Sequence, residues 1–413
     1  MNTRVTNVNN RDISSFRYFF STDVFLLQFT GASSIGDVFE NTPRRERWWE
    51  LFVSICGIIV PSFVLFCEFT TVYLAAKKDL NFMIEALTAT FSGLLSIMKG
   101  IRLWTHRVDL FNLLQNLSKL WESAKLNQLI TSEMIKTAER TKRIRSYYCG
   151  VVIVLALSYC LRPYTLLLNH SLYAMNESYD FSVTIYPATY PFSTGEYISY
   201  LICLAYEIIV MVCVITYWIT CDGLFAQITI HLSLQFEILA EELKQINTIH
   251  KDHSKVYVEN QQLATIAQRH NEMFLHCATA EDFFNPIIFL TVLINGAHCC
   301  FCMFSLEKEL SNGDLNEIMK NLFHIMALSG QTIVYCGYAD RLTHQTSKIS
   351  DAIYNSAWID QSKKFRLMLL TMLMRAQKEY IYTSYGIITL NLQRVTRIAN
   401  AAMGYFALLR SMP

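Results

Sequence analysis

The stretch from Tyr197 to Cys221, YISYLICLAYEIIVMVCVITYWITC, determines the class of fold. It exceeds the roughly 20 apolar residues that an α-helix needs to cross a bilayer, and Glu207 is its only charged residue. The next residues, 222–246 (DGLFAQITIHLSLQFEILAEELKQI), keep apolar side chains at helical spacing. The sequence therefore predicts a long helix that crosses a membrane and continues beyond it.

Six further stretches have the length and hydropathy of membrane spans. They are 48–74, 82–103, 147–168, 283–306, 318–338 and 385–409. Hydrophobic residues make up 52% of the chain and charged residues only 17%, which is too little charge to cover a soluble protein of this size. The second, sixth and seventh spans contain charged or polar residues, so one face of each is expected to meet protein or water. We predict an all-α integral membrane protein with seven transmembrane helices.

The distribution of Lys and Arg predicts the orientation. These residues are frequent before the first span and in the connections after spans two, four and six, but none occurs from 163 to 196. Since cytoplasmic connections carry the excess of positive charge, the N-terminus is expected in the cytoplasm and the C-terminus outside. The glycosylation sequons at Asn169 and Asn176 fall in a connection predicted to be outside. This orientation disfavours a G-protein-coupled receptor, whose N-terminus lies outside.

The spans divide the chain into six segments. They are a cytoplasmic N-terminal segment 1–47, spans one to four 48–221 with a cytoplasmic loop 104–146, a cytoplasmic helical extension 222–282, spans five and six 283–338, cytoplasmic helices 339–384 and a last span 385–413. The cytoplasmic helices have apolar faces and no lipid to cover them, so they are expected to pack together. We predict a helical cytoplasmic anchor formed by extensions of helices four to seven.

Motifs of catalysis are missing from the sequence. It contains no HExxH, no Gly-rich phosphate loop and no GxSxG. The run HCCFC at 298–302 lies in an apolar span, and adjacent cysteines project in different directions around a helix, so buried structural thiols are the favoured interpretation over a metal site. With a net charge of +1, there is no reason to expect nucleic-acid binding. We predict no enzyme activity, no cofactor and no metal.

The last span is unusually polar in its first half. Arg394 and Arg397 lie one turn apart, and a water-filled vestibule is favoured for them over burial against the cytoplasmic helices. Tyr405, Leu408 and Ser411 then recur at intervals of three and share one stripe of the helix. If several copies of this helix surround an axis, Leu408 forms an apolar ring that can close a pore by dewetting. The alternative is a plain packing stripe.

Three C-terminal stretches resemble the insect odorant receptor family. They are QTIVYCGYADRLTHQTSKISDAIYNSAWID at 331–360, FRLMLLTMLMRAQKE at 365–379, and GYFALLRS at 404–411, in which Gly404 replaces the usual Ser. The seven-span topology extends the resemblance over the whole chain. The resemblance implies a subunit of a tetrameric, odorant-gated, non-selective cation channel, with the last helices lining one central pore. On that template Leu408 is the hydrophobic gate, Tyr405 lies a turn below it and Ser411 at the outer mouth.

The resemblance also implies where a ligand and a partner subunit would bind. The family's pocket for small volatile odorants lies in the outer half of the bundle, among spans two, three, four and six. Aligned by topology, the candidate residues are Ile84, Leu87, Thr88, Phe91, Ser158, Leu161, Tyr164, Tyr200, Leu204, Met319, Phe323 and Met326. The short connection between spans four and five implies a ligand-tuned subunit that pairs with the odorant receptor co-receptor. The implied location is the plasma membrane of olfactory neuron dendrites.

Other classes of function remain open from the residues. A metabotropic seven-span chemoreceptor would signal without passing current itself, and a gustatory-type ligand-gated channel shares the topology but ends in a different C-terminal pattern. A transporter is disfavoured, because the sequence has no internal repeat and no broken paired helices.

Overall fold

The computed structural model describes residues 14–40, 42–45, 47–76, 80–173, 179, 181–246, 253–313, 315–356, 358–359 and 361–411. The elements in chain order are α1 Phe16–Phe19, α2 Ser21–Phe29, a 3-10 helix Ser33–Glu40, α3 Trp48–Ala75, α4 Leu80–Thr105, α5 Arg107–Leu126, α6 Ser132–Tyr173, α7 Tyr197–Gln245, α8 His253–Asn312, α9 Leu315–Tyr354, α10 Lys363–Ala376, β1 Thr383–Ser384, β2 Ile388–Thr389 and α11 Leu392–Ser411. The predicted all-helical fold is confirmed, apart from one short hairpin before α11.

Among the described residues, the helices that are long and apolar enough to cross a membrane are α3, α4, α6, α7 and α8. The sixth and seventh predicted spans correspond to α9 and α11, which do not reach the same hydropathy. α9 is continuous over the predicted residues 318–338. α11 begins only at Leu392, because the first residues of the predicted span 385–409 form the hairpin that contains β2. The two additional spans and the orientation therefore stay predictions.

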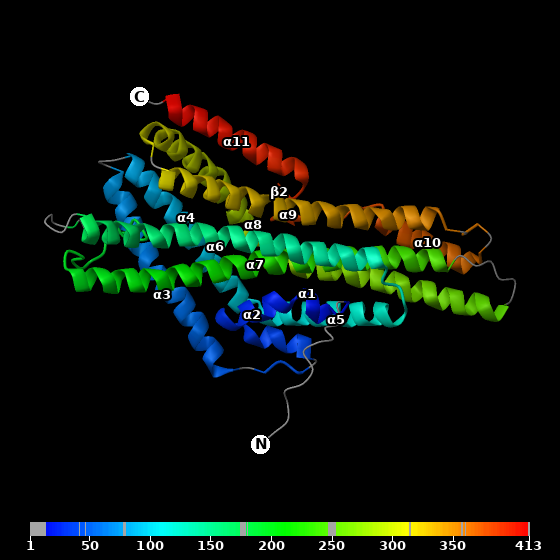
Figure 1. The fold of residues 1–413 in the computed structure, drawn as a ribbon. Coiled ribbons are helices and arrows are strands. Elements are labelled where there is room, and N and C mark those ends of the chain that lie inside the picture. The colour runs from blue at the N-terminus through cyan, green and yellow to red at the C-terminus, as the bar shows by residue number, and fades with distance from the viewer. Residues whose placement is uncertain are drawn as a thin grey trace, which may run out of the picture.

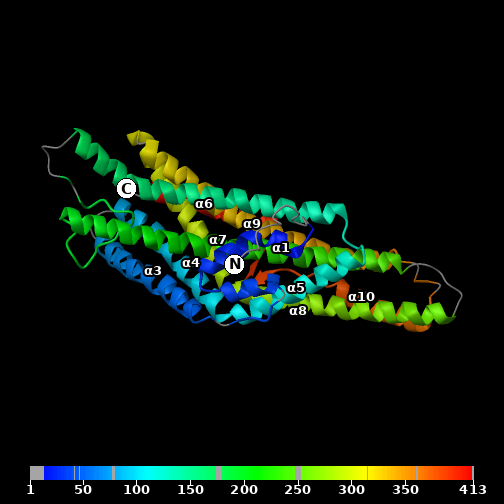
Figure 2. The same cartoon turned by 60° about the horizontal axis from the view of Figure 1, so that its bottom comes forward.

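Four helices, α6 to α9, are far longer than a membrane requires (Figure 1). They run alongside one another and extend well beyond the ends of α3 and α4, and α10 packs on α8 and α9 in this extension (Figure 2). The helix predicted to continue past residue 221 does so, to Gln245. The sequence did not anticipate that α6 begins as early as Ser132. The stretch 339–384 predicted to follow span six begins as a direct continuation of α9 to Tyr354, and α10 follows as a separate helix.

The centre of the fold is the middle of α7, where all residues from Tyr217 to Phe236 are buried. Neighbouring helices pack around it, most extensively α9 and α6. A helix enclosed on all sides is expected to be apolar all round, but this one buries several polar residues, including Gln227, Thr229 and His231. Many apolar side chains of α5, α8 and α9 join its own in one continuous core.

His231 illustrates this burial. Its ring is fully buried against Phe16, Phe19, Phe20 and Trp121, with ring centroids 4.8 to 5.5 Å apart. Neither ring nitrogen has a hydrogen-bond partner within the part of the chain that the structure describes. Burial lowers the pKa of His231 from 6.5 to about 3, since the charged imidazolium would lose its hydration. The N-terminal helices α1 and α2 thus close over a neutral histidine.

This burial predicts acid sensitivity. The unfolded chain protonates His231 near pH 6.5, whereas the folded chain does so only near pH 3. The unfolded state therefore binds more protons in this window, and stability is lost as the pH falls from 6.5 towards 3, by about 1.4 kcal/mol per pH unit for one proton. Thermal unfolding against pH should show that His231→Met flattens the acid limb. Replacement of the exposed His344 should leave it unchanged; equal acid sensitivity of wild type and His231→Met would contradict the prediction.

Candidate ligand-binding site

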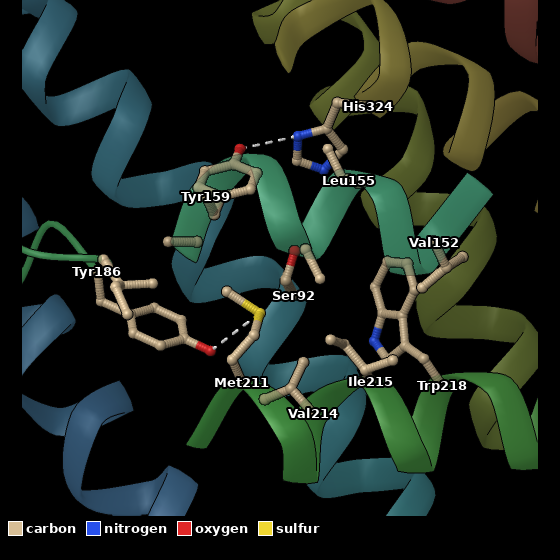
Figure 3. Close-up of a pocket in the computed structure, with 13 residues that line it drawn as sticks. Ser92, Val152, Leu155, Tyr159, Tyr186, Met211, Val214, Ile215, Trp218 and His324 are labelled. Atoms are coloured by element: carbon tan, nitrogen blue, oxygen red, sulfur yellow. Dashed lines mark hydrogen bonds between the residues drawn. The ribbon is translucent and has the colours of Figure 1, made fainter. Parts of the chain in front are cut away.

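A small cavity of about 80 Å³ lies among α4, α6, α7 and α9 (Figure 3). Most of its wall is apolar, and α6 and α7 contribute four residues each. The lining residues are Ala89, Ser92, Val152, Leu155, Ala156, Tyr159, Ile185, Tyr186, Met211, Val214, Ile215, Trp218 and His324. These four helices are the spans in which the sequence placed a ligand pocket. Apolar lining with few polar groups suits a small, uncharged organic molecule.

The polar groups of the cavity are few and mostly paired with one another. The Tyr159 hydroxyl and His324 Nδ1 lie 3.1 Å apart, and the Tyr186 hydroxyl donates to Met211 Sδ at 3.7 Å. The buried Trp218 Nε1–H has no acceptor among the described residues, and Figure 3 shows this nitrogen on the side of the ring that faces the other lining side chains. A buried donor without an acceptor is energetically unfavourable, so Trp218 is available to a ligand oxygen.

The connection between α6 and α7 covers one end of the cavity. It contributes Ile185 and Tyr186 to the wall, and Glu207 on α7 holds it in place. One carboxylate oxygen of Glu207 accepts the Ile185 N–H at 2.8 Å, and the other accepts the Tyr190 hydroxyl at 2.5 Å. Glu207, the only charge in the span that predicts the fold, therefore fixes the cover and does not face the cavity.

The structure places the predicted pocket residues around this cavity and not in its wall. On α4, Ile84 is buried and Leu87 is half-buried; Thr88 lines a second, polar cavity, while Phe91 packs against α8. On α6, Ser158 bonds its own helix, and Leu161 and Tyr164 are exposed. On α7, Tyr200 and Leu204 are buried beneath the cover; on α9, Met319 and Met326 are exposed and Phe323 is half-buried.

The cavity lies deeper in the bundle than the predicted pocket residues, and this difference has a physical cause. The Tyr200 hydroxyl donates to the Val183 carbonyl at 2.6 Å, and its ring packs on Phe181. The cover thus fills the outer part of the bundle, where the sequence placed the ligand, and the cavity begins two to three turns deeper on α7. The sequence does contain a signal for this depth. Tyr159 lies in the middle of the predicted span 147–168, whereas Tyr usually marks the ends of a span.

Directly below the cavity, Asp222 joins three helices. Its Oδ1 accepts hydrogen bonds from Lys99 Nζ at 2.6 Å and the Tyr335 hydroxyl at 2.7 Å; its Oδ2 accepts from the Tyr148 hydroxyl and Gln331 Nε2, both at 2.8 Å. Lys99 and Asp222 are almost completely buried. The carboxylate is therefore fully satisfied, which a buried ion pair requires to be tolerated. The Lys99 ammonium also lies 5.0 Å from the Trp218 ring.

The last helix lies against α8 and α9 only along one side. Tyr405 and Leu408 border a groove between α11 and α8, and both are about 60% exposed. Arg397 is exposed, while the Arg394 guanidinium bonds Thr389 in the hairpin at 3.2 Å. The side chain of Ser411 lies outside the described residues.

The two sequons differ in what the structure describes. Asn169 is exposed near the end of α6, and Asn176 lies outside the described residues. Glycosylation of both stays a prediction.

Apolar helices of membrane-spanning length around a mostly apolar cavity define a helical membrane-protein fold. Residues 79–403 match the 7tm Odorant receptor family, so the chain belongs to the insect odorant receptors, a family of receptors and not of enzymes. Odorant receptor 13a of Drosophila melanogaster is 21% identical over 348 residues, which cover 81% of each chain. Odorant receptor Or2 of Anopheles gambiae is 27% identical over 141 residues, covering 34% of this chain and 36% of that protein.

Solved structures share the fold. The insect olfactory receptor OR5 from Machilis hrabei superposes with a TM-score of 0.77 at 16% identity, covering 97% of this chain and all of that one. The same receptor in complex with eugenol gives a TM-score of 0.79 at 15% identity, covering 97% of this chain and 99% of that one. This likeness supports the arrangement of the helices described above.

Proposed function

We propose that this chain is the ligand-tuned subunit of an odorant-gated, non-selective cation channel, and that it binds a small volatile molecule in the cavity above Trp218. The observation that carries the proposal is the mostly apolar cavity with one unpartnered donor among the described residues, Trp218 Nε1–H. Membership of the odorant receptor family and the eugenol complex of OR5 from Machilis hrabei support a ligand of this class.

The favoured ligand has an apolar body and one oxygen acceptor. Burial of the ligand's carbon atoms against the apolar wall lowers the free energy of binding in proportion to the apolar surface removed from water. An ether, carbonyl or hydroxyl oxygen of the ligand would accept a hydrogen bond from Trp218 Nε1–H. This hydrogen bond is favourable because the buried donor is otherwise unpaired. Charged ligands are excluded, since the cavity offers them no counter-ion.

A continuous set of contacts leads from this cavity to the last helix. Trp218 touches the Lys99 ammonium, and Lys99 is bound to Asp222. Gln331 donates to Asp222 and accepts from Asn295 Nδ2 at 3.0 Å, which reaches α8. The residue after Asn295, Gly296, lines the groove beside α11. We propose that ligand binding moves α8 against α11 along this path, because a ligand shifts a conformational equilibrium only through groups that it touches differently in the two states.

The pore and the partners complete the proposal. In a tetramer with the odorant receptor co-receptor, α11 of each subunit would border the central pore, with Leu408 at the gate, Tyr405 and Ser411 on the same stripe, and Arg394 and Arg397 at the cytoplasmic vestibule. The exposure of α11 supports such an assembly, since its polar first half, with Arg397 exposed, is unfavourable against lipid and requires water or other subunits beside it. The seven-span topology, the cytoplasmic N-terminus and the plasma membrane location in olfactory dendrites belong to this proposal.

The test is whole-cell current from cells that express this chain, the co-receptor, or both. We expect an odorant-evoked cation current that depends on this chain for its ligand selectivity. A second-messenger response to odorant without any current, at normal surface expression, would overturn the channel assignment in favour of a metabotropic receptor.

Trp218→Phe refines this test. For an agonist with one oxygen acceptor, the half-effective concentration should rise about two- to tenfold, corresponding to the loss of one hydrogen bond. For a hydrocarbon analogue of the same shape it should stay within about twofold, because phenylalanine keeps the apolar contact. Trp48→Phe is the matched control, as Trp48 is 86% exposed. Equal shifts for the two ligands would show that Trp218 acts by packing alone.

A further inference from the structure

Between the ligand cavity and the second, polar cavity lies a cluster of three metal-ligating side chains, His298, Cys302 and His324. One potential ligand atom of each lies within 4.8 Å of the other two, and all three residues are buried. His298 and Cys302 are four residues apart and so share one face of α8, while His324 comes from α9. From the sequence, the run HCCFC is expected to hold structural thiols, because the local pattern does not show that α9 adds a second imidazole.

Both imidazoles have a ring nitrogen that a metal ion could bind. The His298 and His324 rings lie 4.2 Å apart between centroids. Neither ring nitrogen of the fully buried His298 has a partner among the described residues. On the other ring, the contact between His324 Nδ1 and the Tyr159 hydroxyl leaves Nε2 for a ligand (Figure 3). This is the usual arrangement around metals, where a second hydrogen bond fixes the orientation of the ligating imidazole.

We propose that His298, Cys302 and His324 form a binding site for a thiophilic d¹⁰ cation, with Cu⁺ favoured over Zn²⁺. Metal–nitrogen distances of about 2.0 Å and metal–sulfur distances of about 2.3 Å require ligand atoms roughly 3.3–3.8 Å apart. The cluster therefore has to close by about 1 Å, which small side-chain rotations achieve. The donor set of imidazole and thiolate selects soft metals over Mg²⁺ or Ca²⁺.

Charge decides between the two cations. Cys302 loses its thiol proton on metal binding, so two neutral imidazoles, one thiolate and Cu⁺ sum to zero charge. The same ligands with Zn²⁺ leave one positive charge, and two carboxylates of the adjoining polar cavity, Glu85 and Glu317, already pair with Lys320 and Arg162. An uncompensated buried charge is strongly unfavourable. A route for the ion exists, because Cys302 and His324 also line the polar cavity with Glu309 and Glu317.

The site would join α8 to α9 at the wall of the ligand cavity. This inference does not rest on the proposed function, because metal binding is measured on the protein without odorant. The experiment uses the purified full-length chain in detergent, with Cu⁺ under reducing conditions or Zn²⁺ titrated against a chelator of known affinity. The readouts are the bound metal per chain, the apparent Kd and the thermal unfolding temperature. We expect one tightly bound Cu⁺ per chain and a higher unfolding temperature.

Variants separate this site from the other thiols of a chain with 12 cysteines. Cys302→Ser and His324→Gln should weaken Cu⁺ binding by at least about tenfold, and Tyr159→Phe by roughly tenfold through the orientation of His324. The matched control is Cys300→Ser, a buried thiol on the same helix that faces the groove with α11, and it should bind as wild type does. Equal losses in Cys302→Ser and Cys300→Ser, or no tightly bound ion in wild type, would overturn the proposal. Tighter binding of Zn²⁺ than Cu⁺ with the same variant pattern would support the site and overturn the charge argument.

Discussion

Replacing Asp222 by asparagine is expected to lower the free energy of unfolding by about 3–5 kcal/mol, which is typical for breaking a buried ion pair on one side only. The variant leaves the Lys99 ammonium without a counter-ion at a site where both partners are almost completely buried. The substitution also places an amide N–H₂, itself a donor, opposite two of the four donors that bond the Asp222 carboxylate. Thermal unfolding in detergent and the yield of monodisperse protein measure the effect.

Two further variants make the Asp222 prediction specific. Asp282→Asn is the matched control, because Asp282 is 73% exposed in its ion pair with Arg102, and it should change stability by less than about 1 kcal/mol. The double variant Lys99→Met/Asp222→Asn should recover part of the loss, since it removes the unpaired buried ammonium. An unfolding temperature of Asp222→Asn equal to wild type would contradict the assigned network.

Filling the cavity from α6 is expected to abolish the odorant response. Ala156→Phe places a ring into the space that the ligand would occupy, as Ala156 lines the cavity and is 7% exposed. We expect the half-effective odorant concentration to rise by at least about a hundredfold, while the overpacking itself lowers stability by about 1–3 kcal/mol. The measurement is odorant-evoked current with the co-receptor, normalised to surface expression.

The neighbouring residue provides the control for this variant. Leu157 lies on the same helix turn but is 52% exposed on the outside of the bundle, so Leu157→Phe should respond as wild type does. A normal response of Ala156→Phe at normal surface expression would place the ligand elsewhere. The groove between α8 and α11 would then be the first alternative, because it is the other apolar cavity described.

Hydropathy was sufficient to predict the apolar parts of the long helices from the sequence, but not α1, α2, α5 or the start of α6 at Ser132. A helix that crosses a membrane must bury its backbone polar groups in its own hydrogen bonds and present apolar side chains, so the local pattern of 197–221 defines the helix without its neighbours. The same reasoning predicted the extension of that helix to Gln245. The C-terminal motifs predicted the family, which the match over residues 79–403 confirms.

The tertiary structure decided everything that depends on distant parts of the chain. It placed the cover of the cavity through Glu207 and Ile185, which set the ligand site deeper than residues such as Tyr200 and Leu204. It also brought Lys99, 123 positions away in the sequence, to Asp222, and His324 to His298. A local pattern reports which face of a helix is apolar, but contacts between helices depend on their relative depth and rotation, and these are set by packing over the whole bundle.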